Sequence, residues 1–318
     1  MTRSNDDFSR NDSLTFGSLG HERSRFFVRR ILEVGKMIKR TFGGSARVSV
    51  VGVGCSRVGS ISNPTSMREI EATLERAVES GINLFDTADI YGQGDSERTL
   101  GRLLRRHQDL FVVTKVGGRH GRFAGAARLA KPLLRLVARS RPNVRSAVVT
   151  ARTATVVHEF SPSDLRAVVE ASRRRLGLSQ LHGLLLHNPS IKTLGSKEIH
   201  DFLAELLESE KAKHVGVSVS TLAEVEAAMS IPALSMIQTP IDVADALPGT
   251  AVLETMRQRD IALFVREILK RPERTAHQNQ AQTPSEALAS AVAPDFVTAA
   301  LVGVSTRKHL NELLSTVA

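Results

Sequence analysis

The stretch GINLFDTADIYG, residues 81–92, decides the fold. It opens with Gly81, continues through a short apolar run and turns polar from Asp86 onward. An apolar run of this length, bounded by glycine and acidic residues, is typical of a strand buried on both faces. The stretch therefore predicts a strand of a parallel sheet that delivers Asp86 and Tyr91 to its carboxyl end.

Runs of the same kind recur along the chain. Eight runs rich in Val, Ile and Leu occupy residues 48–54, 82–89, 110–117, 181–188, 214–220, 234–241, 261–268 and 298–304. Amphipathic stretches separate most of them, so a run and the stretch after it form one strand–helix unit. Eight units in one series predict an α/β fold, a (β/α)8 TIM barrel over residues 48–318, because an open doubly wound sheet typically has fewer strands.

Helix boundaries are marked by residues suited to capping. The candidate N-terminal caps are Ser66 with Glu69, Ser161-Pro162 with Asp164, Thr221 with Glu224, and Thr283-Pro284 with Glu286. A Ser or Thr hydroxyl can accept a hydrogen bond from a free N–H of the first turn, and a Glu three residues later can reach back to the cap. Gly81 and Gly177 stand where the preceding helices are expected to stop.

The first 47 residues lie outside the repeated units. Residues 1–20 are polar and rich in Ser, Asn and Asp, and we expect them to be disordered. Residues 21–47 form an N-terminal basic amphipathic extension, expected to be helical between residues 22 and 40 because of apolar side chains at Phe27, Ile31, Val34 and Ile38. We favour packing of this helix on the barrel over contact with an anionic membrane surface.

Two segments interrupt the regular alternation. Residues 118–160, between the third and fourth strands, contain helical and β-prone pieces at 126–139 and 147–157. Residues 270–283 form a polar segment after the seventh strand. Segments that follow barrel strands shape substrate sites, so the first of these is a candidate lid.

The chain of 318 residues carries a net charge of +10, concentrated in two segments. Residues 21–47 hold eight Lys and Arg against two Glu, and residues 119–152 hold nine Lys and Arg and no acidic residue. Neither segment interleaves aromatic residues with its cations, so we expect no nucleic-acid partner. The sequence shows neither a bilayer-spanning apolar stretch nor the apolar core of a signal peptide, which predicts a cytoplasmic protein. Cys55 is the only cysteine, which excludes an internal disulfide, and nothing indicates an oligomeric state.

Polar residues at the carboxyl ends of three successive strands are the candidate catalytic group. Asp86, Lys115 and His187 stand near the ends of the second, third and fourth strands, and Tyr91 follows in the loop after Asp86. Active sites of such barrels lie at this end, so the four side chains are expected to meet there. Each residue type alone is commonly structural, for example as a carboxylate in a turn or a histidine in the core. The expected meeting of all four at the same end of the barrel favours a catalytic role.

These residue types suit proton transfer to a carbonyl oxygen. A tyrosine with the ordinary pKa of about 10 is a weak acid at neutral pH, and we expect the ammonium of Lys115 to stabilise the phenolate of Tyr91. Asp86 would keep the buried Lys115 charged, and His187 would orient the carbonyl through a ring N–H. No metal is expected, because Cys55 has no neighbouring cysteine and the histidines do not cluster.

The sequence resembles the aldo-keto reductase family from about residue 48 to 314. Residues 81–92, followed by Ser96-Glu97, are similar to a signature of the family, and Thr114-Lys115 and Leu186-His187-Asn188-Pro189 resemble the strands that carry its lysine and histidine. The resemblance implies a catalytic set of Asp86, Tyr91, Lys115 and His187 in an enzyme that reduces an aldehyde, a ketone or a sugar-like carbonyl. It also implies NADPH or NADH as the cofactor, bound without a Rossmann domain.

The resemblance implies cofactor-binding residues in the second half of the chain. They are Ser218 and Gln238 for the carboxamide, Arg266 where many members have an aromatic residue against the nicotinamide ring, and Gly303, Ser305, Arg307 and Glu312 in the loop for the adenosine phosphate. A strand that leads into a helix N-terminus presents free N–H groups to a phosphate, and the charge of Arg307 and Lys308 favours NADPH over NADH. Val219 and Leu313 stand where the family usually has asparagine.

Other functions stay open. Val219, Leu313 and the two basic segments are compatible with a catalytically weak or inactive regulatory or binding protein on the same barrel, which would keep the cofactor without turnover. A different barrel enzyme, such as an isomerase, is disfavoured because phosphate-binding glycines are missing after the seventh strand. Gly52, Gly54 and Gly59 only superficially resemble a dinucleotide fingerprint. The basic insertion suggests an anionic or sugar-like small-molecule substrate.

Overall fold

The computed structural model describes residues 37–60, 63–120, 156–270 and 283–315. Eight parallel strands close into a barrel, in which the last strand along the chain pairs with the first. The strands are β3 (Val51–Gly54), β4 (Leu84–Asp86), β5 (Phe111–Val116), β8 (Leu181–His187), β9 (Ala212–Ser218), β10 (Leu234–Pro240), β11 (Ala262–Arg266) and β12 (Ala299–Val302). Each lies mostly or wholly within one of the eight predicted runs, so the predicted (β/α)8 barrel is confirmed.

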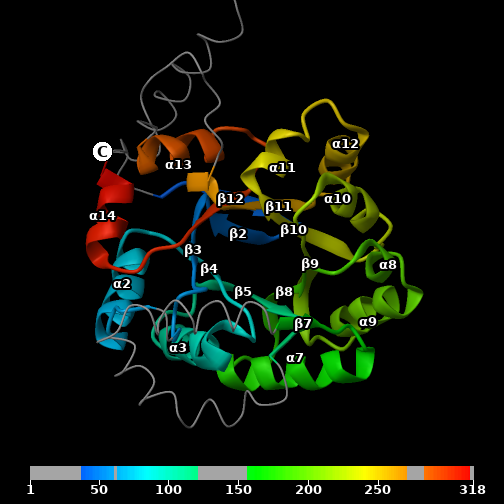
Figure 1. Cartoon of the computed structure of the whole chain (residues 1–318), viewed down its shortest axis with the longest axis horizontal. Coiled ribbons are helices and arrows are strands. Elements are labelled where there is room, and N and C mark those ends of the chain that lie inside the picture. The colour runs from blue at the N-terminus through cyan, green and yellow to red at the C-terminus, as the bar shows by residue number, and fades with distance from the viewer. Residues whose placement is uncertain (1–36, 61–62, 121–155, 271–282, 316–318) are drawn as a thin grey trace, which may run out of the picture.

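Helices surround the barrel on all sides (Figure 1). They are α2 (Met67–Glu79), α3 (Asp95–Leu104), α7 (Pro162–Leu176), α8 (Ile191–Leu194), α9 (Lys197–Glu208), α10 (Leu222–Ala228), α11 (Ile241–Asp245), α12 (Ala251–Gln258), α13 (Pro284–Val292) and α14 (Arg307–Ser315), with short 3-10 helices η1 (Tyr91–Gly94) and η2 (Ile268–Lys270). Apolar side chains fill the barrel interior, among them Leu84, Val113 and Met236. A larger apolar layer lies between the strands and the helices.

Three of the four predicted caps form. Ser66, Thr221 and Thr283 each accept a hydrogen bond from the backbone N–H three residues later. At the fourth, α7 begins at Pro162 as expected, but Ser161 makes no side-chain capping bond to the backbone. Gly177 ends α7 in the left-handed conformation, with φ of 71°, which a residue with a side chain adopts only at a cost.

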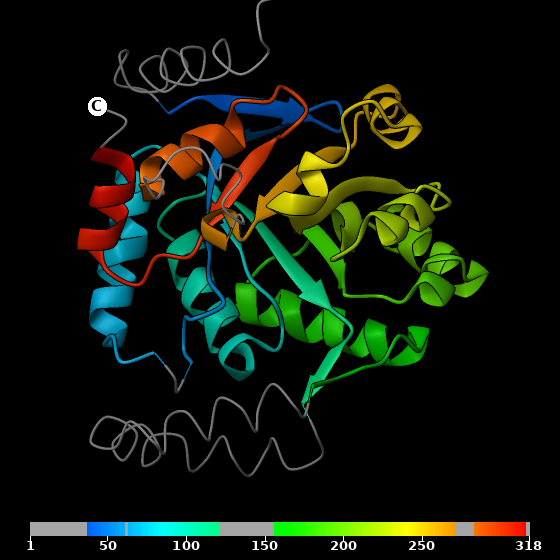
Figure 2. The ribbon, with the colours of Figure 1, turned by 45° about the horizontal axis from the view of Figure 1, so that its top comes forward.

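The barrel is closed at one end by a hairpin that the sequence did not predict (Figure 2). β1 (Lys39–Phe42) and β2 (Ala46–Ser49) pair antiparallel across a turn that contains Gly43 and Gly44. Phe42 packs edge to face against Phe111 and Phe264, with ring centroids 5.7 Å apart in both pairs. The prediction of a helix reaching residue 40 is therefore wrong at its end, because adjacent glycines with positive φ permit a tight turn and Phe42 is buried in the barrel.

The hairpin also changes the start of the barrel. The predicted first strand, residues 48–54, is divided between β2 and β3, and only β3 belongs to the barrel. The remainder of the predicted N-terminal extension, residues 21–36, and the polar residues 1–20 lie outside the described residues.

At the opposite end of the barrel, the predicted insertion begins and ends in a two-stranded ribbon (Figure 2). β6 (Gly118–His120) pairs antiparallel with β7 (Val156–His158). The predicted helical piece at 126–139 and most of the piece at 147–157 lie outside the described residues, as does most of the polar segment 270–283.

None of the described helices is long and apolar enough to cross a bilayer. Within the described ranges, no three His, Cys, Asp or Glu side chains are grouped as metal ligands would be.

One partly buried histidine of the barrel gives the fold a sensitivity to acid. His182 Nδ1 accepts a hydrogen bond from the Val112 N–H at 3.2 Å, which requires the neutral ring. Burial, and then the charge of Lys213, lowers the pKa of His182 to about 4 from its ordinary value of 6.5. The unfolded chain binds this proton more readily, so the stabilisation is present above pH 6.5 and is lost as the pH falls towards 4.

A His182→Gln variant tests this effect, because the glutamine oxygen can accept the same hydrogen bond without titrating. Between about pH 7 and pH 4.5, we expect the free energy of unfolding of the variant to fall by about 2 kcal/mol less than that of the wild type. Urea denaturation at the two pH values measures the difference. His200→Gln, on α9, is the control for loss of a histidine, and equal falls for both variants and the wild type would contradict the assignment.

Candidate active site

The four predicted catalytic side chains meet at the carboxyl end of the barrel. Asp86 and His187 are the last residues of β4 and β8, and Lys115 lies near the end of β5, which separates those strands. Tyr91 is the first residue of η1. Its ring meets the ring of His187 edge to face, with centroids 5.9 Å apart, and Lys115 Nζ lies 5.2 Å from the centroid of the Tyr91 ring.

Lys115 and Asp86 form a buried ion pair. Lys115 Nζ lies 2.5 Å from Asp86 Oδ1 and donates a second hydrogen bond, of 3.0 Å, to the carbonyl oxygen of Thr87. The two side chains are only 1% and 9% exposed. Burial alone would lower the pKa of Lys115, but the charges of Asp86 and Tyr91 outweigh it and raise the pKa above its ordinary value. Lys115 is therefore a permanent cation next to the tyrosine, as expected.

Tyr91 differs from the expectation in the direction of its pKa. Burial raises the pKa of its hydroxyl, and the opposing effect of Lys115 is smaller, so the net shift is upward. The sequence could place the cation beside the ring, but it could not give the degree of burial. In this structure Tyr91 holds its proton throughout the neutral pH range, and Lys115 partly offsets the cost of removing it.

His187 is neutral under the same conditions. Burial, followed by repulsion from Lys115, lowers the pKa of His187 to about 3. Its Nδ1 is buried and has no hydrogen-bond partner in the part of the chain that the structure describes. A neutral ring carries one N–H donor, and the tautomer of His187 is not fixed by a bond at Nδ1.

Sequence reasoning missed one neighbour of His187. His158 of β7 lies edge to face against His187, with ring centroids 6.1 Å apart, and stacks on Phe160. His158 belongs to the long insertion after the third strand, so this segment reaches the candidate catalytic group. The available signal was the position of the insertion at the catalytic end of the barrel, which predicts a contact there but does not identify the residue.

Two predicted cofactor residues are linked by hydrogen bonds to the candidate catalytic group. Gln238 Nε2 donates to Asp86 Oδ1 at 2.8 Å, and Ser218 Oγ donates to Gln238 Oε1 at 3.0 Å. Both side chains are buried, at the ends of β10 and β9. Asp86 therefore accepts from Gln238 as well as from Lys115, through the same oxygen.

Arg266 and Val219 are neighbours on the adjoining part of the rim. The Arg266 guanidinium donates to the carbonyl oxygen of Val219 at 3.1 Å and to the Ser220 hydroxyl at 2.9 Å, and it forms an ion pair with Glu267. The Val219 side chain is fully buried in the layer between strands and helices. Val219 therefore contributes an apolar group to the core, while its carbonyl oxygen accepts a hydrogen bond from Arg266.

The remaining predicted cofactor residues form a second group, at the end of β12 and the start of α14. Gly303 and Ser305 lie in the connecting loop, and Arg307 and Glu312 lie on the helix. Arg307 is exposed and pairs with Glu69 of α2. Leu313 is buried against the apolar layer, which accounts for a hydrophobic residue at that position.

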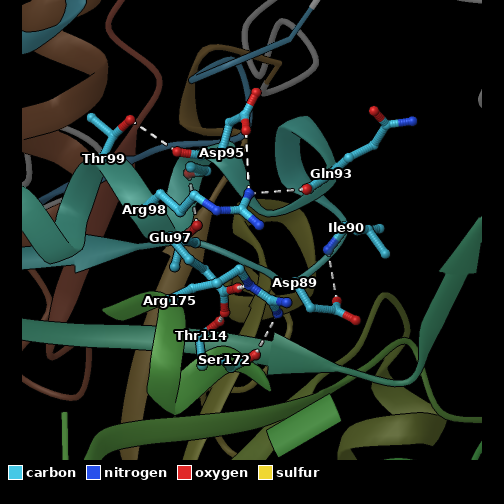
Figure 3. A network of polar contacts seen from close by, with 12 residues as sticks. Asp89, Ile90, Gln93, Asp95, Glu97, Arg98, Thr99, Thr114, Ser172 and Arg175 are labelled. Atoms are coloured by element: carbon cyan, nitrogen blue, oxygen red, sulfur yellow. Dashed lines mark hydrogen bonds and ion pairs between the residues drawn. The ribbon is translucent and has the colours of Figure 1, made fainter. Parts of the chain in front are cut away.

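A buried polar network holds the segment that carries Tyr91 (Figure 3). Glu97, on α3, is fully buried, accepts a 2.7 Å hydrogen bond from the Thr114 hydroxyl and pairs with Arg175 of α7 at 2.5 Å. Nearby, burial and the charge of Glu97 raise the pKa of Asp89 to about 8. The network ties α3 to β5 and α7, and it thereby fixes the turn between Asp86 and Glu97.

Removal of the Glu97 charge is expected to destabilise the fold. In a Glu97→Gln variant the guanidinium of Arg175, which is 20% exposed, loses its carboxylate partner, although it still donates to the Ser172 hydroxyl. We expect a loss of about 2–3 kcal/mol in the free energy of unfolding, measured by urea denaturation. Glu205→Gln is the matched control, because its pair with Arg166 is exposed and should contribute much less to stability. Equal losses for the two variants would contradict the role of the buried pair.

Comparisons with known proteins place the chain in a family. The sequence profile of the Aldo/keto reductase family matches residues 50–318. The aldo-keto reductase yakc of Schizosaccharomyces pombe, named for NADP(+), is 22% identical over 226 residues, 69% of this chain and 58% of the relative. D-threo-aldose 1-dehydrogenase of a Pseudomonas species is 33% identical over 149 residues, 45% of this chain and 40% of the relative. The matched stretches thus span less than two thirds of either relative.

The fold has close counterparts among solved structures. An aldo-keto reductase from Klebsiella pneumoniae in complex with NADPH superposes with a TM-score of 0.58 at 18% identity, and the match covers 88% of this chain and 90% of that one. At this identity the likeness concerns the fold. The family profile covers the whole barrel, including all four residues that meet at its carboxyl end. The chain belongs to the aldo/keto reductase family.

Proposed function

We propose that the chain is an NADPH-dependent reductase that converts an aldehyde or a ketone to an alcohol. The observation that carries the proposal is the buried Lys115–Asp86 pair, set beside Tyr91 and a neutral His187 at the catalytic end of the barrel. A carbonyl reductase needs a proton donor and a group that orients the carbonyl oxygen, and these side chains supply both.

Tyr91 is the proposed proton donor. Its raised pKa keeps the hydroxyl protonated at neutral pH, so that a proton is available when the carbonyl oxygen becomes basic. Lys115 lies over its ring and stabilises the phenolate that the transfer leaves behind. Asp86 keeps Lys115 charged and, through Gln238, links the pair to the proposed cofactor site.

His187 is proposed to orient the carbonyl oxygen. Its pKa of about 3 keeps the ring neutral, and a neutral ring donates a hydrogen bond without competing with Tyr91 as an acid. The edge-to-face contact between the two rings supports a joint role, because it holds both side chains together at the carboxyl end of the barrel.

The residues present fit a nicotinamide cofactor. Ser218 and Gln238 offer a hydroxyl and an amide at adjacent strand ends, which match the donor and acceptor of a carboxamide. Gly303 leaves open space where a side chain would stand, and the start of α14 with Arg307 suits a phosphate. When bound, the dihydronicotinamide supplies a hydride to the carbonyl carbon. The name of the yeast relative and the NADPH complex of the solved structure support NADPH.

A sugar-like substrate is the proposed class within this reaction. The support is the likeness to an aldose dehydrogenase, at 33% identity over less than half of this chain. The exposed His158 beside His187 adds a polar group at the edge of the catalytic set.

The test is cofactor binding followed by turnover. Titration of the purified chain with NADPH and NADH, followed by cofactor fluorescence, is expected to show binding of NADPH. Oxidation of NADPH in the presence of a panel of aldehydes and aldoses is then expected to yield the corresponding alcohols. Binding of neither cofactor would contradict the proposal. Binding without turnover of any carbonyl would instead favour a regulatory or binding protein on the same barrel.

A further inference from the structure

An acidic side chain of α2 lies on the first turn of α14. One oxygen of Glu69 accepts the backbone N–H of Arg307 at 3.2 Å and its guanidinium Nε at 3.3 Å, and the other accepts Nη2 at 3.1 Å. A carboxylate thus already satisfies a free N–H at the start of the helix and the cation beside it. These are the groups that the proposed function assigns to the adenosine phosphate.

The Glu69 carboxylate contacts Arg307 and does not bond to the cap residue of its own helix. The pattern of Ser or Thr followed three residues later by Glu occurs at the starts of α2, α10 and α13. In α10 and α13, Glu224 and Glu286 reach back to the backbone N–H of their own cap residues. In α2 the Ser66 hydroxyl caps the helix, but the Glu69 carboxylate turns to α14. Glu69 is therefore oriented toward Arg307 and not toward its own cap residue.

The contact is accessible to a ligand. Glu69 and Arg307 line a groove of about 670 Å³ together with Arg76, Lys308, Asn311 and Glu312. The two paired side chains are 29% and 56% exposed. An ion pair with this exposure is weak and can be opened by a competing anion.

The charge of Glu69 favours some anions over others. Hydrogen bonds from Arg307 lower the pKa of Glu69, so the carboxylate is ionised at neutral pH. The 2′-phosphate of NADPH carries more than one negative charge and would have to displace Glu69 from Arg307 and remain near it. NADH has a hydroxyl at that position and is not repelled.

We propose that Glu69 is a specificity-determining residue that competes with the 2′-phosphate of NADPH for Arg307 and thereby reduces the preference of the chain for NADPH over NADH. The inference rests on the proposed use of a nicotinamide cofactor, and it concerns the choice between the two cofactors. Glu69 acts through Arg307 and has no part in the transfer of hydride or proton.

Nucleotide binding to a Glu69→Gln variant tests the inference without any reaction. The probes are adenosine 2′,5′-bisphosphate and adenosine 5′-monophosphate, which differ only in the 2′-phosphate, titrated by calorimetry. The variant is expected to bind the bisphosphate about fivefold more tightly than the wild type does, because the internal competitor has lost its charge. Affinity for the monophosphate should change by less than about twofold. NADPH and NADH, followed by fluorescence, should show the same contrast.

Two further variants test whether the effect is specific to Glu69 and whether it depends on Arg307. Glu71→Gln removes a carboxylate from the same helix, where Glu71 pairs with Arg102 at 2.5 Å, and should leave both affinities unchanged. In an Arg307→Gln background, Glu69→Gln should lose its effect on the bisphosphate, since the two act as one pair.

The outcomes distinguish this inference from the proposed function. If the wild type binds NADPH and Glu69→Gln improves both nucleotides equally or neither of them, the role of Glu69 is overturned while the proposed function stands. If the wild type and every variant bind neither cofactor, the proposed function is overturned, and the inference with it.

Discussion

Replacement of Tyr91 by phenylalanine is expected to lower kcat for carbonyl reduction by about 10³-fold while the affinity for NADPH changes by less than about twofold. The substitution removes the proposed proton donor and keeps the ring that contacts His187 and lies beneath Lys115. Steady-state oxidation of NADPH measures the first quantity, and cofactor fluorescence measures the second.

The control for this variant is its stability. Phenylalanine keeps the partly buried ring and its contact with His187, so an intact fold should show a midpoint of thermal unfolding close to that of the wild type. A Tyr91→Phe variant that retains its fold and more than about a tenth of the wild-type kcat would show that another group donates the proton.

Replacement of Lys115 by methionine is expected to affect both activity and stability. Without the ammonium, the phenolate of Tyr91 is no longer stabilised, and we expect kcat to fall by about 10³-fold. The variant also leaves the Asp86 carboxylate buried without a cation, although Gln238 still donates to it. We expect a loss of about 3 kcal/mol in the free energy of unfolding, measured by urea denaturation.

A double variant separates the two effects. In Asp86→Asn with Lys115→Met, the uncompensated charge is gone, so the stability should largely return while the activity remains lost. Recovery of activity in the double variant would contradict the role of Lys115 in stabilising the phenolate. If the double variant does not recover stability, the loss in Lys115→Met comes from the packing of the lysine side chain and not from the uncompensated charge of Asp86.

The repeated strands could be predicted from the sequence, whereas the hairpin could not. Strands buried on both faces have continuous apolar runs, and all eight gave that signal. The hairpin lies next to a basic amphipathic stretch, and its apolar residues Phe42, Ala46 and Val48 are too few to distinguish a short strand from a helix end. The signal that favours a turn was the pair Gly43-Gly44.

The meeting of the catalytic residues could also be predicted, because the barrel brings adjacent strand ends together. The pKa of Tyr91 could not, since it depends on the balance between burial and the charge of Lys115. The contact between Glu69 and Arg307 joins helices from opposite ends of the chain, and the local capping pattern around Ser66 predicts a different partner for Glu69. Long-range contacts between surface side chains leave no periodicity in the sequence.

The central claim is that a hydride is transferred to a carbonyl carbon and that Tyr91 supplies the proton. Isotope labelling of the product tests this claim most directly. The measurement uses NADPH deuterated at the transferring position of its nicotinamide ring, an aldehyde or aldose substrate, and mass spectrometry of the alcohol. With the wild type, the product should carry one deuterium on the former carbonyl carbon, and the Tyr91→Phe variant should yield almost no product. Absence of labelled alcohol from the wild type with every carbonyl tested, or equal labelling by the variant, would contradict the account.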